Sequence, residues 1–79
     1  MADLDAARTA AVAIETGHGG DNAAVASEDG RAMIRVDLPS SEVNAAQATA
    51  AEYGFRLVGR DGSGSRWRDR YVFAAGGQV

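Results

Sequence analysis

The sequence contains no cysteine, no lysine and only one histidine and one proline. The lack of cysteine excludes a disulfide framework, a thiolate zinc site and a cysteine nucleophile. A secreted domain of 79 residues would usually carry disulfides, so we expect a cytoplasmic protein. No apolar run approaches the length of a membrane span, and residues 1–5 are acidic where a signal peptide would be basic. We therefore expect no membrane partner.

All eight basic side chains are arginines. With abundant alanine, glycine, aspartate and valine, this composition is typical of a GC-rich or halophilic source, and the pI of 4.9 suits either. The single histidine, His18, excludes a His-rich metal site. We expect no metal site and no cofactor.

A chain of 79 residues holds one domain at most. Folding removes roughly 60% of the unfolded surface at this size, so the core is small and self-association would add stability. We expect a single domain over residues 1–75 and a flexible C-terminal tail over residues 76–79.

The residue pattern predicts the order α-β-β-α-β-β. Asp3 is the expected N-cap of a helix that runs to about Thr16 and ends at Gly17. Pro39 and the residues after it are typical of a second helix start. The other predicted elements are strands at 22–27 and 31–38 joined by a tight turn, a helix at 41–53, and strands at 55–60 and 67–75 joined by a flexible loop at 61–65.

This order suits an α+β fold, a four-stranded antiparallel sheet with both helices on one face. It resembles a ferredoxin-like chain whose first strand has been moved to the end, which implies that residues 31–38 and 71–75 form the central strands. The resemblance concerns topology and implies no function. The inward registers predict one buried cluster of Ile34, Val36, Leu38, Val43, Leu57, Tyr71 and Phe73.

Charge is distributed unevenly along the chain. Residues 1–52 hold nine acidic residues and three arginines, whereas residues 53–79 hold five arginines and two acidic residues. Strand alternation predicts that Arg56, Arg60, Arg68 and Arg70 share the face that the helices leave open, with Arg35 beside them. The candidate binding surface is therefore Arg35, Arg56, Arg60, Arg66, Trp67, Arg68 and Arg70.

Three interpretations of this surface are open. The first is a solvated face, whose arginines lie near acidic residues of the first hairpin and whose arginine stems cover apolar area. The second is a homodimer or other protein interface, and the third is a nucleic-acid surface on which Trp67 stacks a base. We expect a small non-enzymatic binding or regulatory domain that self-associates through its open sheet face. The alternative is a nucleic-acid-binding domain that uses the arginine-rich second hairpin.

Other motifs are weaker. His18 is followed by Gly19, Gly20 and Asp21. We expect His18 to be a capping or exposed loop histidine and not a catalytic residue. The glycine-rich segment 59–65 lacks the lysine and the helix start of a P-loop, which predicts a hairpin loop. The pair Gly76-Gly77 resembles the diglycine of ubiquitin-like modifiers, but a disordered tail is the interpretation that we adopt.

Overall fold

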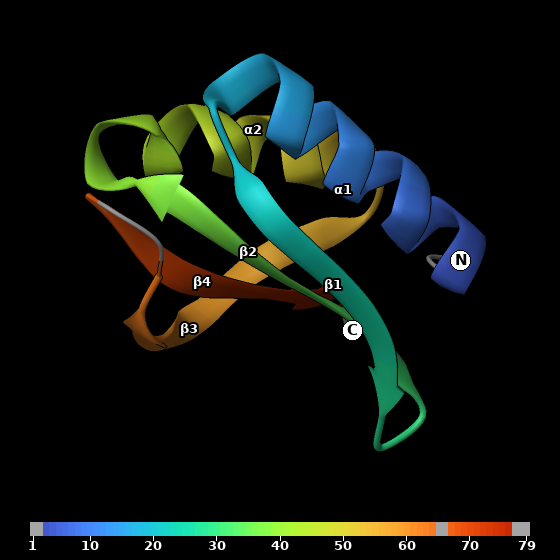
Figure 1. Cartoon of the computed structure of the whole chain (residues 1–79). Coiled ribbons are helices and arrows are strands. Elements are labelled where there is room, and N and C mark those ends of the chain that lie inside the picture. Colours follow the sequence, from blue (N-terminus) through green and yellow to red (C-terminus); the bar gives the residue numbers. More distant parts are fainter. Residues whose placement is uncertain (1–2, 65–66, 77–79) are drawn as a thin grey trace.

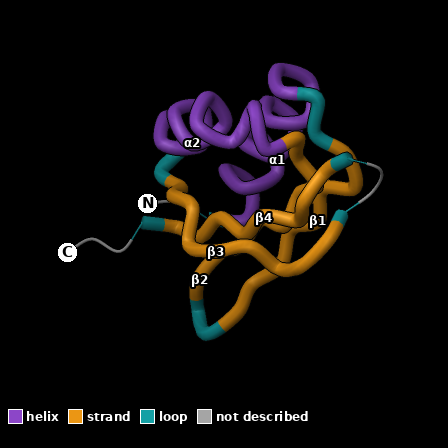
Figure 2. The backbone as a smooth tube through the Cα atoms, turned by 90° about the vertical axis from the view of Figure 1, so that its left-hand side faces the viewer, coloured by secondary structure: helices purple, strands orange, loops and turns teal. Residues whose placement is uncertain are grey.

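The computed structural model describes residues 3–64 and 67–76, which form two layers (Figures 1 and 2). Two helices lie side by side on one face of a sheet, and no helix covers the other face of the sheet within the described residues. The elements are α1 (Leu4–His18), β1 (Asp21–Glu28), β2 (Arg31–Pro39), a 3₁₀ turn (Ser40–Glu42), α2 (Val43–Glu52), β3 (Phe55–Ser63) and β4 (Arg68–Ala75).

The sheet has the strand order β1-β2-β4-β3, and each neighbouring pair is antiparallel. The predicted α+β class and element order are confirmed. The central position of β2 and β4, which the permuted arrangement requires, is also confirmed. Both edges of the sheet are therefore formed by the less apolar strand of each hairpin, β1 and β3.

Helix α1 begins and ends at identifiable caps. The Asp3 carboxylate accepts a hydrogen bond from the Ala6 main-chain N–H at 3.0 Å, as predicted for an N-cap. The helix continues past the predicted stop at Gly17 and ends at Gly19, whose φ of 68° is the left-handed conformation that favours glycine. Of the two glycines that flank His18, the second therefore ends the helix, and His18 becomes a helical residue.

The predicted turn between β1 and β2 is confirmed, and its geometry follows from two residues. Asp29 and Gly30 have φ values of 53° and 77°, so both central residues of this two-residue loop are left-handed. Loops of this kind match the right-handed twist of the strands on either side. The register brings Glu28 opposite Arg31, and β2 pairs with β1 on one side and, from Met33 onward, with β4 on the other.

Strand β3 is longer and less regular than predicted. It extends to Ser63, and its register against β4 shifts between Leu57 and Gly59 and again between Arg60 and Ser63. The segment predicted as a flexible loop thus belongs largely to the strand. The first shift reverses the facing of Gly59 and Arg60, and the second shift reverses the facing again, which strict alternation could not anticipate.

The core lies between the helices and the inner face of the sheet. Ile34, Val36, Leu38 and Phe73 are fully buried, as predicted, whereas Val43, Leu57 and Tyr71 are partly buried and pack against them. The helices contribute mainly small residues to this core: Ala7, Ala10, Ala11, Ile14, Ala46 and Ala50. Phe55 at the start of β3 is also buried.

The end of β4 is tied to the turn after α2. Gly76 donates its main-chain N–H to the carbonyl of Gly54 at 2.8 Å. The rest of the predicted tail, residues 77–79, lies outside the described residues. Among the helices of the described chain, none is long and apolar enough to cross a membrane.

Candidate binding surface

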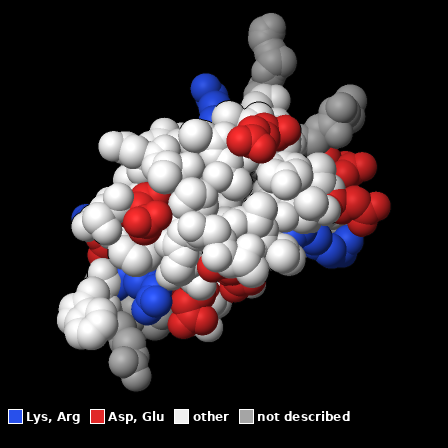
Figure 3. Space-filling model, turned by 90° about the horizontal axis from the view of Figure 1, so that it is seen from above, with Lys and Arg blue, Asp and Glu red and all other residues white. Residues whose placement is uncertain are grey.

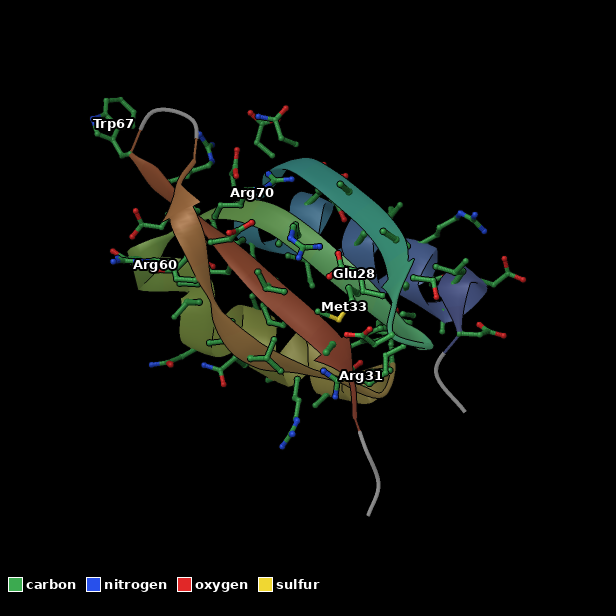
Figure 4. All side chains as sticks on the ribbon, turned by 90° about the horizontal axis from the view of Figure 1, so that it is seen from below. Glu28, Arg31, Met33, Arg60, Trp67 and Arg70 are labelled. Carbon is green, nitrogen blue, oxygen red and sulfur yellow. The ribbon has the colours of Figure 1, made fainter. Side chains whose placement is uncertain are left out.

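The face of the sheet that no helix covers is here called the open face. Each strand contributes alternate residues to it, and Figure 4 shows this face from below. The register places Ala24 opposite Arg35, Ala26 opposite Met33, and Asp37 opposite Arg70. Figure 4 also shows that Arg31 lies near one end of this face and Trp67 lies beyond the other.

Arg35 spans the open face. Its guanidinium donates to both carboxylate oxygens of Glu28 on β1, and its Nε donates to Asp61 Oδ2 on β3 at 3.3 Å. Because β4 lies between β2 and β3, the Arg35 side chain passes over Val72, its direct neighbour on β4. The hydrogen bond from Arg35 lowers the pKa of Glu28 from its usual value near 4.5, and the same bond raises the pKa of Arg35.

Asp37 is a buried carboxylate on the open face, only 3% exposed. Arg70 Nη1 donates to Asp37 Oδ1 at 2.9 Å, and Asn22 Nδ2 donates to Asp37 Oδ2 at 3.1 Å. The same Arg70 nitrogen donates to the Asn22 main-chain carbonyl at 3.2 Å. Gly64 lies against the carboxylate so closely that a Cβ at this position would be 2.6 Å from Asp37 Cγ. This cluster joins β1, β2, β4 and the end of β3.

A small apolar cluster lies at the centre of the open face. Met33, Val72 and Ala74 form a buried group that is separate from the main core. Ala24 and Ala26 extend this group to β1, where both residues are exposed. The centre of the open face is thus a buried apolar group, with exposed alanines on β1 beside it and with the paired charges of Arg35, Glu28 and Asp61 over it.

The structure brings together only part of the predicted arginine surface. Arg35, Arg56 and Arg70 share the open face with their strand neighbours. Arg60 does not, because the register shift after Leu57 places it opposite Tyr71, on the helix side, where its Nη1 donates to Asp69 Oδ2 at 3.3 Å. The prediction that strict alternation holds along β3 is therefore wrong for Arg60.

The remaining predicted residues lie near the β3–β4 connection. Arg68 turns its Nε to the main-chain carbonyl of Gly19 and donates to it at 2.8 Å. Arg66 lies outside the described residues. Of the predicted arginines that the structure describes, Arg56 alone forms no hydrogen bond or salt bridge with a described residue.

Trp67 is the most exposed large apolar side chain in the described chain, with 87% of its surface accessible. It projects away from the body of the molecule at the β4 end of the second hairpin (Figure 4). Exposed tryptophan is uncommon, because the side chain is large and gains free energy on burial. It is also the residue type most often found as an anchor in protein interfaces.

The opposite surface, formed by the helices, has a different character. Seen from above, its acidic and arginine side chains lie mainly around the rim, and uncharged residues fill the middle (Figure 3). No cluster of cations forms on this side in that view.

The sequence interpretation missed a hydrogen-bonded group around His18. The side chain is only 14% exposed, so the prediction of an exposed loop histidine is wrong. His18 Nε2 lies 2.7 Å from Thr49 Oγ1 on α2, and His18 Nδ1 lies 3.3 Å from Glu42 Oε1. The signal that could have located this group is the helical phase, since extending α1 by two residues turns His18 towards α2.

This group has the order of a hydroxyl, an imidazole and a carboxylate. In the neutral imidazole, a proton on Nδ1 donated to Glu42 leaves Nε2 to accept the Thr49 hydroxyl proton. A surface hollow of about 340 Å³ beside it is lined by Gly17, His18, Gly19, Pro39, Ser41 and Glu42. Thr49 does not line this hollow, so a molecule bound there would meet the imidazole on the side away from the hydroxyl. We call this hydrogen-bonded group of Thr49, His18 and Glu42, which joins α1 to α2, the His18 clamp.

The described residues contain no group of three or more histidine, aspartate or glutamate side chains that could hold a metal ion. Comparison of the chain with models of known protein families, with curated proteins and with solved structures finds no match. A function for this chain must therefore be proposed from its own surfaces.

Proposed function

We propose that this chain is a small non-enzymatic binding domain that self-associates by packing the open faces of two sheets against each other. The observation that carries the proposal is the second apolar cluster. Met33, Val72 and Ala74 lie at the centre of a face that no described helix covers. These three residues are already at most 9% exposed in the single chain, so a partner sheet would add burial mainly at the exposed Ala24 and Ala26 and along the Arg35 stem. Self-association adds stability to a small domain, and methionine and arginine are both favoured in interfaces.

The size of the open face supports a dimer of modest affinity. Four strands of about eight residues cover roughly 27 Å by 19 Å, or about 500 Å² for each chain. Two such faces bury about 1,000 Å², which is close to the lower limit for a specific protein interface. Trp67 would add to this area, because burying its exposed surface contributes a few kcal/mol.

The pairing of the arginines favours a protein partner over nucleic acid. Arg35, Arg60 and Arg70 each donate to a carboxylate, and Arg68 donates to a main-chain carbonyl. Phosphate binding would have to replace these partners in a chain whose net charge is −3. When the charged side chains of a face already have partners, burying that face against a second neutral face costs less desolvation free energy.

The test is the mass in solution, measured by sedimentation over a range of protein concentrations. Val72 is only 8% exposed, so circular dichroism must first show that Val72→Lys still folds; in the folded variant a charged head lies at the centre of the open face, and its stem lies along the sheet. We expect this variant to have a lower mass than the wild type. Val58→Lys is the matched control, because Val58 lies at the register shift of edge strand β3 and is already 45% exposed.

The outcomes are distinct. Equal masses for the wild type and Val72→Lys would contradict the proposed interface. Adding a single-stranded oligonucleotide to the wild type tests the alternative. A mass increase that is lost at high salt and in Arg68→Gln/Arg70→Gln would favour nucleic-acid binding.

A further inference from the structure

The two edges of the sheet differ in regularity. Strand β3 is interrupted by two register shifts, and such bulges disrupt pairing with another strand. Strand β1 pairs with β2 without interruption over residues 24–28, and its irregularity is confined to its first residues. Residues 23–27 of β1 contain no charge and no proline, so the usual defences of an exposed edge are missing from its middle.

Helix α1 runs antiparallel to this edge and lies above it (Figure 1). At one end, Glu15 Oε2 accepts a hydrogen bond from the Ala23 main-chain N–H at 3.1 Å. At the other end, Arg8 lines the same surface hollow as Ser27. The helix segment 8–15 thus runs along the strand segment 23–27, with Glu15 at the Ala23 end and Arg8 at the Ser27 end.

The flank of α1 above β1 carries Arg8, Val12 and Glu15 at helical spacing. Val12 is 58% exposed, and it is the only exposed large apolar side chain of the described helices. Arg8 and Glu15 carry opposite charges and are equally distant from the point between Ala11 and Val12. The flank therefore has an apolar centre with a cation on one side and an anion on the other.

We propose that a second copy of this chain docks on the β1 edge, with β1 pairing antiparallel to β1 of the partner and the two α1 helices side by side. A two-fold axis that passes between the two Val25 residues then also passes close to both Val12 residues, because helix segment 8–15 runs along strand segment 23–27. The axis brings Arg8 of each chain opposite Glu15 of the other and makes the two valines meet. The result is one continuous eight-stranded sheet with all four helices on the same face.

The charge pattern is what selects a second copy as the occupant. A two-fold axis places each residue of one chain opposite the residue of the other chain that lies equally far on the other side of the axis. A cation and an anion at equal distances on either side of the axis therefore form two pairs across the interface. The existing contacts do not oppose this. The Arg8–Asp5 salt bridge is highly exposed and contributes little, and Glu15 accepts from Ala23 through Oε2, which leaves Oε1 for Arg8 of the second copy. This interface is separate from the open face and does not rest on the function proposed above.

The experiment compares masses by sedimentation across a concentration series. Val12→Lys should raise the dissociation constant of the edge dimer at least tenfold, because two ammonium groups would meet at the axis. Val58→Lys, on the opposite edge, should leave the constant unchanged. If both interfaces form, the wild type reaches four chains, Val12→Lys stops at two through the open face, and Val72→Lys stops at two through the edge.

A charge exchange adds a test that only the two-fold arrangement passes. Arg8→Glu should weaken association by about tenfold, since two exposed salt bridges become two repulsive pairs. Combining it with Glu15→Arg should restore association, and circular dichroism checks that this variant still folds. Hydrogen exchange gives a second readout, because the edge amides of residues 24–28 should be protected in the wild type and not in Val12→Lys.

The inference is overturned if Val12→Lys and the wild type have the same mass at all concentrations, or if the charge exchange fails to restore association. It is also overturned if the wild type is a monomer throughout. A mass that falls in Val72→Lys but not in Val12→Lys would retain the open-face proposal and reject the edge. The reverse result would retain the edge and reject the open face.

Discussion

Replacing His18 by alanine should destabilise the fold, because the imidazole joins the C-terminal end of α1 to α2 through two contacts. Each hydrogen bond contributes about 0.5–1.5 kcal/mol, and the buried ring adds packing, so we expect a loss of about 2–3 kcal/mol. A domain of this size has only about 4–12 kcal/mol of stability in total. The thermal midpoint should therefore fall by roughly 10–20 °C.

The assay is thermal unfolding followed by circular dichroism. Thr16→Ala is the control, since the Thr16 hydroxyl contacts only the Val12 carbonyl of its own helix, and its midpoint should move little. Thr49→Val removes the hydroxyl partner, and the double variant with His18→Ala should cost at least about 0.5 kcal/mol less than the sum of the two. A thermal midpoint of His18→Ala within about 2 °C of the wild type would refute the stabilising role of the His18 clamp.

Three further predictions concern the open face. Gly64→Ala should cost about 1–3 kcal/mol in urea unfolding because its Cβ would collide with a buried carboxylate, whereas Gly59→Ala meets nothing within 4 Å and should be nearly neutral. Arg70→Gln should cost about 2–3 kcal/mol in the same assay, and the exposed Arg56→Gln less than about 0.5 kcal/mol. Glu28→Gln should be less stable than the wild type at neutral pH; because the folded pKa of Glu28 is lowered, this difference should shrink as the pH falls below the usual value near 4.5 and vanish as the pH falls through the folded pKa.

Much of the fold could be predicted from local sequence signals, such as caps and turn residues, because tertiary contacts do not override them. Asp3 caps α1 as its sequence position suggests, and the Asp29-Gly30 pair forms the expected tight turn. The choice between Gly17 and Gly19 as the helix stop could not be made locally. The longer helix is stabilised by contacts of His18 with residues 24 and 31 positions away, and no local pattern encodes these contacts.

The candidate surface was less predictable because its geometry depends on register. The shift after Leu57 moves Arg60 to the helix side, and a two-residue alternation cannot anticipate an extra residue in the strand. The solvated-face interpretation places the arginines near acidic residues of the first hairpin, and Arg70 does pair with Asp37, as Arg35 does with Glu28. The second partner of Arg35, Asp61 on β3, lies outside that interpretation. The sequence indicated an arginine-rich face, and the structure adds that most of its described charges are paired.

The most direct test of the proposed self-association is the mass of the wild-type chain in solution as a function of concentration. We predict a mass above the 8.2 kDa of one chain, which rises with concentration and falls in Val72→Lys. A mass of 8.2 kDa at every concentration would contradict the central claim that this domain binds a second copy of itself.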